Sequence, residues 1–173
     1  LGGRSRMFTE AFADQFKDKA DLCAICDNNA GRLELAEQYL KKQYPDLKTY
    51  PAQKFDEMVK SRKPDTVIVT TIDAMHDEYI CRAMELGCDV ITEKPMTTDE
   101  KKCQRIIDTA QKTRKNVRVT FNYRYSPPRT QIKKLLMDGV IGKVLSVEFQ
   151  WLLDTTHGAD YFRRWHSDKK NSG

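Results

Sequence analysis

The sequence predicts the α/β class, with a doubly wound parallel sheet whose faces are covered by helices. Two observations support this prediction. First, short apolar runs alternate with amphipathic stretches up to about residue 122, and each pair occupies roughly 20 to 30 residues, as a βαβ unit requires. Second, residues 66–70 form a continuous β-branched run, which is typical of a strand covered on both faces.

The elements follow in order from the same patterns. Apolar residues at three- and four-residue spacing predict helices, and short apolar runs bounded by polar turns predict strands. The expected helices cover residues 3–17, 31–43, 55–59, 75–86 and 98–115. The expected strands cover residues 22–25, 47–50, 66–70, 90–92 and 117–121.

After residue 126 the alternation changes. A helix containing Ile132 and Leu135 is followed by a longer alternating run at 144–152, which predicts a strand in an open antiparallel or mixed sheet. The polar, aromatic stretch 154–173 lacks periodicity and is expected to be a loop. We therefore expect one domain at residues 1–122, lacking its first strand, and the truncated start of an α+β domain at 123–173.

Composition excludes several classes of protein. The net charge is +5, but Lys and Arg are interspersed with Asp and Glu, so a nucleic-acid surface is not expected. No apolar run approaches the roughly 20 residues of a membrane span, and we expect a cytoplasmic protein. The five Cys are expected to be reduced thiols. Cys23 and Cys26 would point to opposite faces of a strand, so no metal site is expected.

Glycines at a helix start and an acid after the next strand predict a dinucleotide site. Gly2-Gly3-Arg4-Ser5 would leave backbone N–H groups open to a pyrophosphate. Asp27 follows about 20 residues on, where an acid accepts hydrogen bonds from the ribose hydroxyls of NAD. Asn28 comes next rather than Arg, which favours NAD, whereas Arg32 keeps NADP open. A turn or tag, and a solvated or helix-capping acid, are the alternatives.

Two further motifs resemble those of one family. Gly87-Cys88-Asp89-Val90-Ile91-Thr92-Glu93-Lys94-Pro95 matches a Gly-x-x-Val-x-x-Glu-Lys-Pro run, and Asn122-Tyr123-Arg124 matches an Asn-x-Arg element. In both, the chain resembles the Gfo/Idh/MocA family of NAD(P)-dependent oxidoreductases, which have a Rossmann-type doubly wound sheet. Ile72 departs from the family, which has Pro there.

The resemblance implies hydride transfer between a nicotinamide dinucleotide and a hydroxyl-bearing carbon of a sugar, polyol or related cyclic compound. Lys94 would hydrogen-bond the reacting oxygen and exchange its proton; otherwise it is a surface Lys paired with Glu93. Glu93 would contact the cofactor ribose or orient Lys94. Thr70, Thr71, His76 and Asn122 would line the cofactor, although His76 could equally be a cap or a buried polar residue. Arg124 would hold cofactor or substrate, or form a salt bridge between domains.

The aromatic and basic stretch near the end predicts substrate contacts, with Tyr161, Arg163, Trp165 and His166 as candidates, or else an interface loop. Ser172-Gly173 resembles the opening of the element that carries the family's catalytic His, which is therefore expected beyond residue 173. Residues 1–173 alone are expected to bind dinucleotide weakly and to be inactive. The complete protein is expected to be a homo-oligomer. A non-catalytic dinucleotide-binding regulator, and NAD-assisted glycoside cleavage or epimerisation without net redox change, are the alternative functions.

Overall fold

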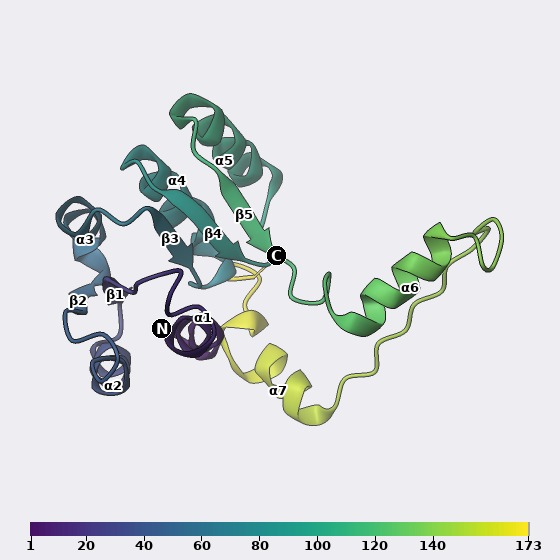
Figure 1. The fold of residues 1–173 in the computed structure, drawn as a ribbon, viewed down its shortest axis with the longest axis horizontal. Coiled ribbons are helices and arrows are strands. Elements are labelled where there is room, and N and C mark those ends of the chain that lie inside the picture. Colours follow the sequence, from purple (N-terminus) through teal and green to yellow (C-terminus); the bar gives the residue numbers. More distant parts are fainter. Residues whose placement is uncertain (173) are drawn as a thin grey trace.

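The computed structural model describes residues 1–172, with the side chain of Asp160 excepted. Five strands alternate with helices along the first 120 residues (Figure 1). The strands are β1 (Ala24–Asp27), β2 (Lys48–Pro51), β3 (Thr66–Val69), β4 (Asp89–Glu93) and β5 (Val117–Thr120). The helices between them are α1 (Gly3–Asp14), α2 (Ala30–Leu40), α3 (Phe55–Arg62), α4 (His76–Glu85) and α5 (Glu100–Thr113), with short 3-10 turns η1 (Ala52–Lys54) and η2 (Asp73–Met75).

All strand pairs in the described residues are parallel, which confirms the predicted α/β class. β1 pairs with β2, and β3, β4 and β5 form a second sheet in that order. Within residues 1–172 no ladder joins the β1–β2 pair to the β3–β5 triplet. In a doubly wound sheet the strand order reverses between the two halves of the sheet. Ligands bind at that position, outside the carboxyl ends of the strands.

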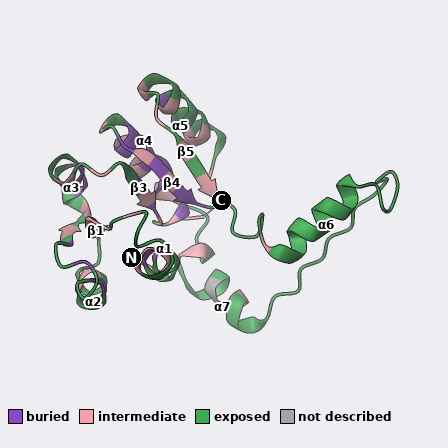
Figure 2. Cartoon of the chain, in the orientation of Figure 1, coloured by how far each residue is buried: buried purple, intermediate pink, exposed green. Residues whose placement is uncertain are grey.

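The core follows this division into two sheets. α4 packs on β3 and β4, and Ile80, Cys81 and Ala83 on its inner face are completely buried (Figure 2). A second cluster, around Ile25 of β1 and Leu40 of α2, lies under the β1–β2 pair. The buried residues of α2, α4 and α5 include apolar residues that the spacing predicts, such as Leu40, Ile80 and Ile106. α1 differs, because its buried residues are Ser5 and Thr9, whereas Met7 and Phe16 of the predicted stripe are exposed.

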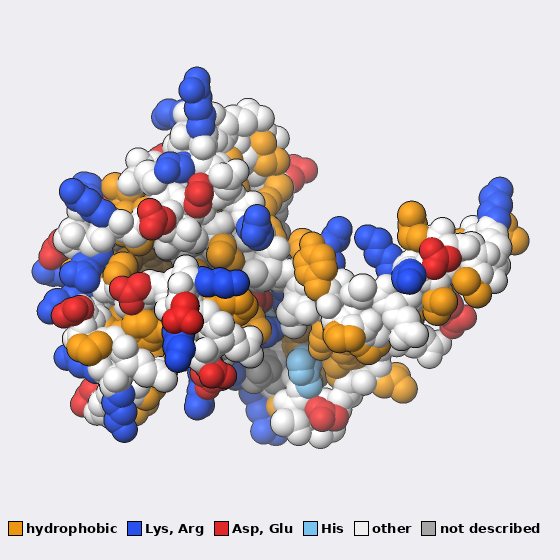
Figure 3. Space-filling view, in the orientation of Figure 1, with side chains coloured by type: hydrophobic (Ala, Val, Ile, Leu, Met, Phe, Trp, Pro, Cys, Tyr) orange, Lys and Arg blue, Asp and Glu red, His pale blue; other side chains and the backbone are white. Residues whose placement is uncertain are grey.

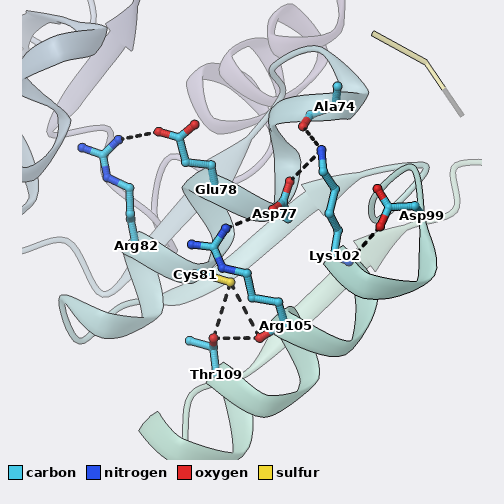
Figure 4. Close-up of polar contacts among 9 residues, drawn as sticks. All are labelled: Ala74, Asp77, Glu78, Cys81, Arg82, Asp99, Lys102, Arg105 and Thr109. Carbon is cyan, nitrogen blue, oxygen red and sulfur yellow. Dashed lines mark hydrogen bonds and ion pairs between the residues drawn. The ribbon is translucent and has the colours of Figure 1, made fainter. Parts of the chain in front are cut away.

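An ion-pair cluster joins α4 to α5 and fixes the connection that leaves β3 (Figure 4). The Asp77 carboxylate is buried and lies 3.3 Å from Lys102 Nζ and 3.1 Å from Arg105 Nη1. Lys102 Nζ also donates to the carbonyl oxygen of Ala74, at 2.5 Å. α5 therefore holds both the turn before α4 and the first turn of α4.

Two predictions for the second part of the chain were wrong. Residues 144–152 form no strand in the described structure; they are extended and largely exposed. An alternating run becomes a strand only when a partner supplies hydrogen bonds. The stretch 154–173 is not a loop throughout, because it contains α7 (Thr155–Arg163) and the 3-10 turn η3 (Trp165–Ser167). Gly173 lies outside the described residues.

The expected helix around Ile132 is confirmed as α6 (Pro127–Met137). α6 and the extended segment after it project away from the parallel sheet, and η3 returns to it (Figure 1). Hydrophobic side chains lie open on this projecting part, whereas charges of both signs are mixed over the α/β body (Figure 3). None of the helices in residues 1–172 has both the length and the apolar character that crossing a membrane requires.

Candidate functional site

The glycine turn before α1 presents open backbone at a helix N-terminus. Gly2 is the N-cap residue of α1. Ser5 is buried, and its hydroxyl donates to the Gly2 carbonyl oxygen at 2.8 Å, which closes the turn. A Cβ added at Gly2 or Gly3 would meet no atom within 4 Å. The first N–H groups of a helix lack intrahelical partners and favour anions, so this turn fits a pyrophosphate.

Asp27 lies beside this turn, at the carboxyl end of β1. Its Oδ1 atom accepts from the Asn29 backbone N–H at 2.8 Å, and its Oδ2 atom lies against the backbone nitrogen of Leu1, directly before the glycine turn. Asn29, not Asp27, caps α2, because its Oδ1 accepts from Arg32 N at 3.0 Å. Asn28 is exposed. The acid and the glycine turn therefore come together as an NAD site requires, with space in front of the glycines.

Glu93 links the glycine turn to the other sheet. It is the last residue of β4 and is 4% exposed. Its Oε2 atom lies 3.3 Å from Arg4 Nε on α1, and its Oε1 accepts from the Thr120 hydroxyl of β5 at 2.9 Å. These contacts place the start of α1 against the carboxyl edge of β4 and β5.

Lys94 follows at once and is exposed at the same edge. In the described part of the chain its ammonium makes no hydrogen bond or ion pair with Glu93 or any other residue, so the alternative of a Lys94–Glu93 surface pair is not what the structure contains. Its charge acts on Asp73 across the edge. The ammonium is available to a ligand that lies between the glycine turn and this edge.

His76 is the first residue of α4 and is 1% exposed. Its Nδ1 atom lies 2.8 Å from the Pro95 carbonyl oxygen, and Nε2 lies 3.1 Å from the Thr71 carbonyl oxygen. Of the two alternatives, a buried polar residue describes its position. Thr70 is partly buried, and Thr71 is exposed with its hydroxyl bonded to the Ile72 carbonyl oxygen at 3.3 Å.

Asp73 is a site residue that the sequence analysis missed. Its carboxylate is 9% exposed and accepts from the Ser172 hydroxyl at 3.3 Å, while Ala74 N donates to the Asn171 carbonyl oxygen at 3.2 Å. Burial raises the pKa of Asp73, and His76, His166, Ser172 and Lys94 act in the opposite direction. The sequence did contain a signal for Asp73, because it is an acid in the polar turn between the 66–70 strand and His76. Asp73 and Ala74 therefore hold the end of the described chain at the turn after β3.

The other predicted contacts are less closely assembled. Asn122 and Arg124 are exposed in the turn after β5, and the Arg124 guanidinium lies 5.9 Å from the Tyr125 ring centre. Tyr161 and Arg163 are exposed on α7. His166 stacks on Trp165, with ring centres 3.6 Å apart, and its charge lowers the pKa of Asp73.

Metal-binding side chains do not cluster in this part of the protein. Over residues 1–172, no group of three or more His, Cys, Asp or Glu residues is placed to hold a metal ion. The five cysteines are free thiols. The candidate site therefore consists of the glycine turn, Asp27, and the carboxyl edge of β3 and β4.

Comparison with known proteins identifies the family. The profile described as "Oxidoreductase family, NAD-binding Rossmann fold" matches residues 1–121. The chain is 38% identical over 170 residues to YteT of Bacillus subtilis, which its name describes as an oxidoreductase, covering 96% of this chain and 39% of YteT. It is 33% identical over 129 residues to the inositol 2-dehydrogenase/D-chiro-inositol 3-dehydrogenase of Lactiplantibacillus plantarum, covering 74% of this chain and 35% of that protein.

A solved structure has the same fold. The WlbA dehydrogenase of Bordetella pertussis, in complex with NADH and UDP-GlcNAcA, aligns with a TM-score of 0.82 at 22% identity, covering 99% of this chain and 49% of that one. The chain thus spans less than half the length of these relatives. The profile match, the parallel sheet and the glycine turn facing Asp27 agree, and the chain belongs to the Gfo/Idh/MocA family of oxidoreductases with an NAD-binding Rossmann fold.

Proposed function

We propose that the complete protein transfers a hydride between a nicotinamide dinucleotide and a hydroxyl-bearing carbon of a sugar, polyol or related cyclic compound. The family supports dinucleotide-dependent oxidoreduction, and the inositol dehydrogenase among its relatives supports a polyhydroxylated substrate. The observation that carries the proposal is the exposed Lys94 ammonium, free of hydrogen bonds and ion pairs within the described residues, at the carboxyl edge that Arg4 and Glu93 join to the glycine turn.

The cofactor is proposed to be NAD, which supplies the hydride acceptor. Gly2, Gly3, Arg4 and Ser5 would receive the pyrophosphate at the start of α1. Asp27 would accept hydrogen bonds from the adenosine ribose hydroxyls and repel a 2′-phosphate, with Asn28 alongside. Thr70 and Thr71 would line the nicotinamide half after β3.

Lys94 would handle the proton of the reacting hydroxyl. As the free amine it accepts that proton when the alcohol is oxidised, and as the ammonium it donates one when the carbonyl is reduced. Arg124, Tyr161, Arg163, Trp165 and His166 are proposed to contact the substrate. Among these residues, His166 has the strongest structural support, because its charge, like that of Lys94, lowers the pKa of Asp73.

The test compares Lys94→Ala and Lys94→Arg in the complete protein. NAD reduction is followed with a panel of polyols and sugars, and NAD binding is measured by calorimetry. We expect turnover to fall by at least about 100-fold, the size of a general acid–base contribution, while NAD affinity changes little. Lys101→Ala on the exposed face of α5 is the matched control. Turnover retained in Lys94→Ala would refute the mechanism.

Chemical analysis of the products belongs to the same experiment. A bound dinucleotide that is reduced and reoxidised within one turnover would give a new product without net NADH. A chain that binds NAD but converts no member of the panel would favour the regulatory alternative. NADH formation that is measured in the parent and lost in Lys94→Ala would support the proposed dehydrogenase function.

We also propose that residues 1–122 are the dinucleotide-binding domain and residues 123–173 begin a substrate-binding and dimerisation domain. The separation of the β1–β2 pair from the β3–β5 triplet supports a further strand between them in the complete protein. The exposed hydrophobic side chains between residues 132 and 153 support association of the second domain with more chain or with another subunit. Light scattering of the complete protein measures its oligomeric state.

A further inference from the structure

The two ring nitrogens of His76 connect two loops that leave the sheet side by side. Nδ1 lies 2.8 Å from the Pro95 carbonyl oxygen, in the loop after β4, and Nε2 lies 3.1 Å from the Thr71 carbonyl oxygen, in the loop after β3. The imidazole is 1% exposed. A neutral imidazole donates to one carbonyl oxygen, and the shorter of the two contacts is the one from Nδ1 to Pro95. Both nitrogens face backbone, so the ring presents neither to a cofactor or substrate.

The Lys94 side chain, by contrast, has no hydrogen bond of its own in the described structure to direct it. Its direction must come from the backbone on either side. On one side Glu93 is held by Arg4 and Thr120. On the other side Pro95 has no N–H, so its carbonyl oxygen is the one backbone group through which hydrogen bonding can hold it, and His76 occupies that oxygen.

We propose that His76 is a positioning residue for Lys94, acting through the Nδ1 contact to the Pro95 carbonyl. The proposal rests on the proposed function only in giving Lys94 its proton-handling role. A side chain that must meet a reacting oxygen within about an ångström benefits from a fixed backbone, because a misplacement of that size can cost about 100-fold in rate.

His76 is itself fixed from α5. The residue after it, Asp77, is ion-paired with Lys102 and Arg105, and Lys102 also holds the Ala74 carbonyl oxygen (Figure 4). The start of α4 is therefore tied on both sides of His76. This arrangement makes the imidazole a rigid spacer between α5 and the Pro95 loop.

Two substitutions separate the two contacts of the ring. The side-chain amide nitrogen of Asn falls near the position of Nδ1, and that of Gln near the position of Nε2. His76→Asn therefore keeps a donor for Pro95, and His76→Gln keeps one for Thr71. Both are neutral amides, and the melting temperatures of the two variants are measured so that they are compared at equal stability.

The readout is the ammonium of Lys94 in the complete protein. Lysines are reductively methylated with ¹³C-formaldehyde, and the Lys94 resonance is assigned by its loss in Lys94→Arg. We expect the resonance of His76→Asn to stay at the parental position and that of His76→Gln to move. Where the parent oxidises a member of the polyol panel, kcat is expected to fall about 100-fold in His76→Gln and less than tenfold in His76→Asn, with equal KM for NAD.

The inference is overturned if the two variants behave alike at equal melting temperature, whether the Lys94 resonance moves in both or in neither. Should His76→Gln fail to fold, Lys102→Met replaces it: loss of the Ala74 contact is expected to move the Lys94 resonance, and an unmoved resonance overturns the proposal. Turnover retained in Lys94→Ala refutes the proposed function instead, and the methyl-lysine spectra still decide whether His76 positions Lys94.

Discussion

Arg4 and Glu93 lie 89 positions apart in the chain, yet Arg4 Nε and Glu93 Oε2 are 3.3 Å from one another. The Glu93 side chain is 5% exposed and the Arg4 side chain 42% exposed. This pair joins the helix that follows the glycine turn to the strand that carries Lys94. It therefore sets the spacing between the two halves of the candidate site.

Loss of Arg4 is expected to destabilise the fold. Arg4→Ala leaves the buried Glu93 carboxylate with the Thr120 hydroxyl alone, and the free energy of unfolding should fall by about 1–3 kcal/mol. Urea denaturation measures the change. Arg6→Ala is the control on the same helix, since its pair with Glu10 is exposed at both ends and should contribute less than about 0.5 kcal/mol. Equal losses of unfolding free energy in Arg4→Ala and Arg6→Ala would show that the Arg4–Glu93 pair contributes no more to stability than an exposed pair.

Removal of the charge at Asp27 is expected to change cofactor preference. Asp27→Asn keeps the acceptor for Asn29 N but removes a charged acceptor for ribose hydroxyls, so the Kd for NAD should rise about 10- to 100-fold. The affinity for NADP should change less or improve, because the carboxylate no longer repels a 2′-phosphate. NADH and NADPH fluorescence titrations measure both. Glu34→Ala, an exposed change on α2, should alter neither, and an unchanged NAD Kd in Asp27→Asn would place the ribose elsewhere.

Two glycine substitutions should have opposite signs. Gly87 follows the C-cap residue of α4 with φ of +93°, and an added Cβ there meets no atom within 4 Å, so the cost of Gly87→Ala is conformational and about 1–2 kcal/mol. Gly158 lies inside α7 with equally open space, so Gly158→Ala should stabilise that helix by about 0.5–1 kcal/mol. Thermal unfolding measures both changes. A stabilised Gly87→Ala variant would contradict the left-handed conformation at this helix end.

The Cys26 thiol should make stability depend on alkaline pH. Burial, and then the Asp27 carboxylate, raise the pKa of Cys26 from 9.0 to about 11. Above pH 9 the unfolded chain loses this proton while the folded chain keeps it, so the contribution is complete below pH 9 and is lost as the pH rises through 11. Urea denaturation at pH 8 and pH 10.5 should show a smaller fall in Cys26→Ala than in the parent, and Cys103→Ala should fall as the parent does. Slow alkylation of Cys26 relative to Cys103 at pH 8 is the independent check, and equal rates would contradict the raised pKa of Cys26.

The Rossmann part of the fold was predictable from the sequence because its signals are local. The β-branched run at 66–70 became β3, and the glycine turn and Asp27 came together as their spacing indicates. The run at 144–152 was misassigned because a strand depends on a partner that local pattern does not supply. α7 was missed because Thr155, Thr156 and Gly158 are weak helix formers.

The site was predictable in its residue types but not in its partners. Lys94 and Asp27 follow from motifs, whereas the pairing of Glu93 with Arg4 rather than with Lys94 depends on how α1 crosses the sheet edge. Nothing in the sequence shows that both ring nitrogens of His76 face backbone carbonyl oxygens. Asp73 was missed because its partner Ser172 is 99 positions away.

The contacts of Ser172 with Asp73 and of Asn171 with Ala74 give the projecting segment two attachment points on the cofactor domain, one after β5 and one at η2. The chain between them is an excursion whose closure entropy grows only slowly with length, about 0.6 kcal/mol for each doubling. Its length and composition can therefore be exchanged with little cost to the dinucleotide domain. Chimaeras that import this excursion from another family member, joined at the same two points, should keep the recipient's affinity for NAD, which calorimetry measures.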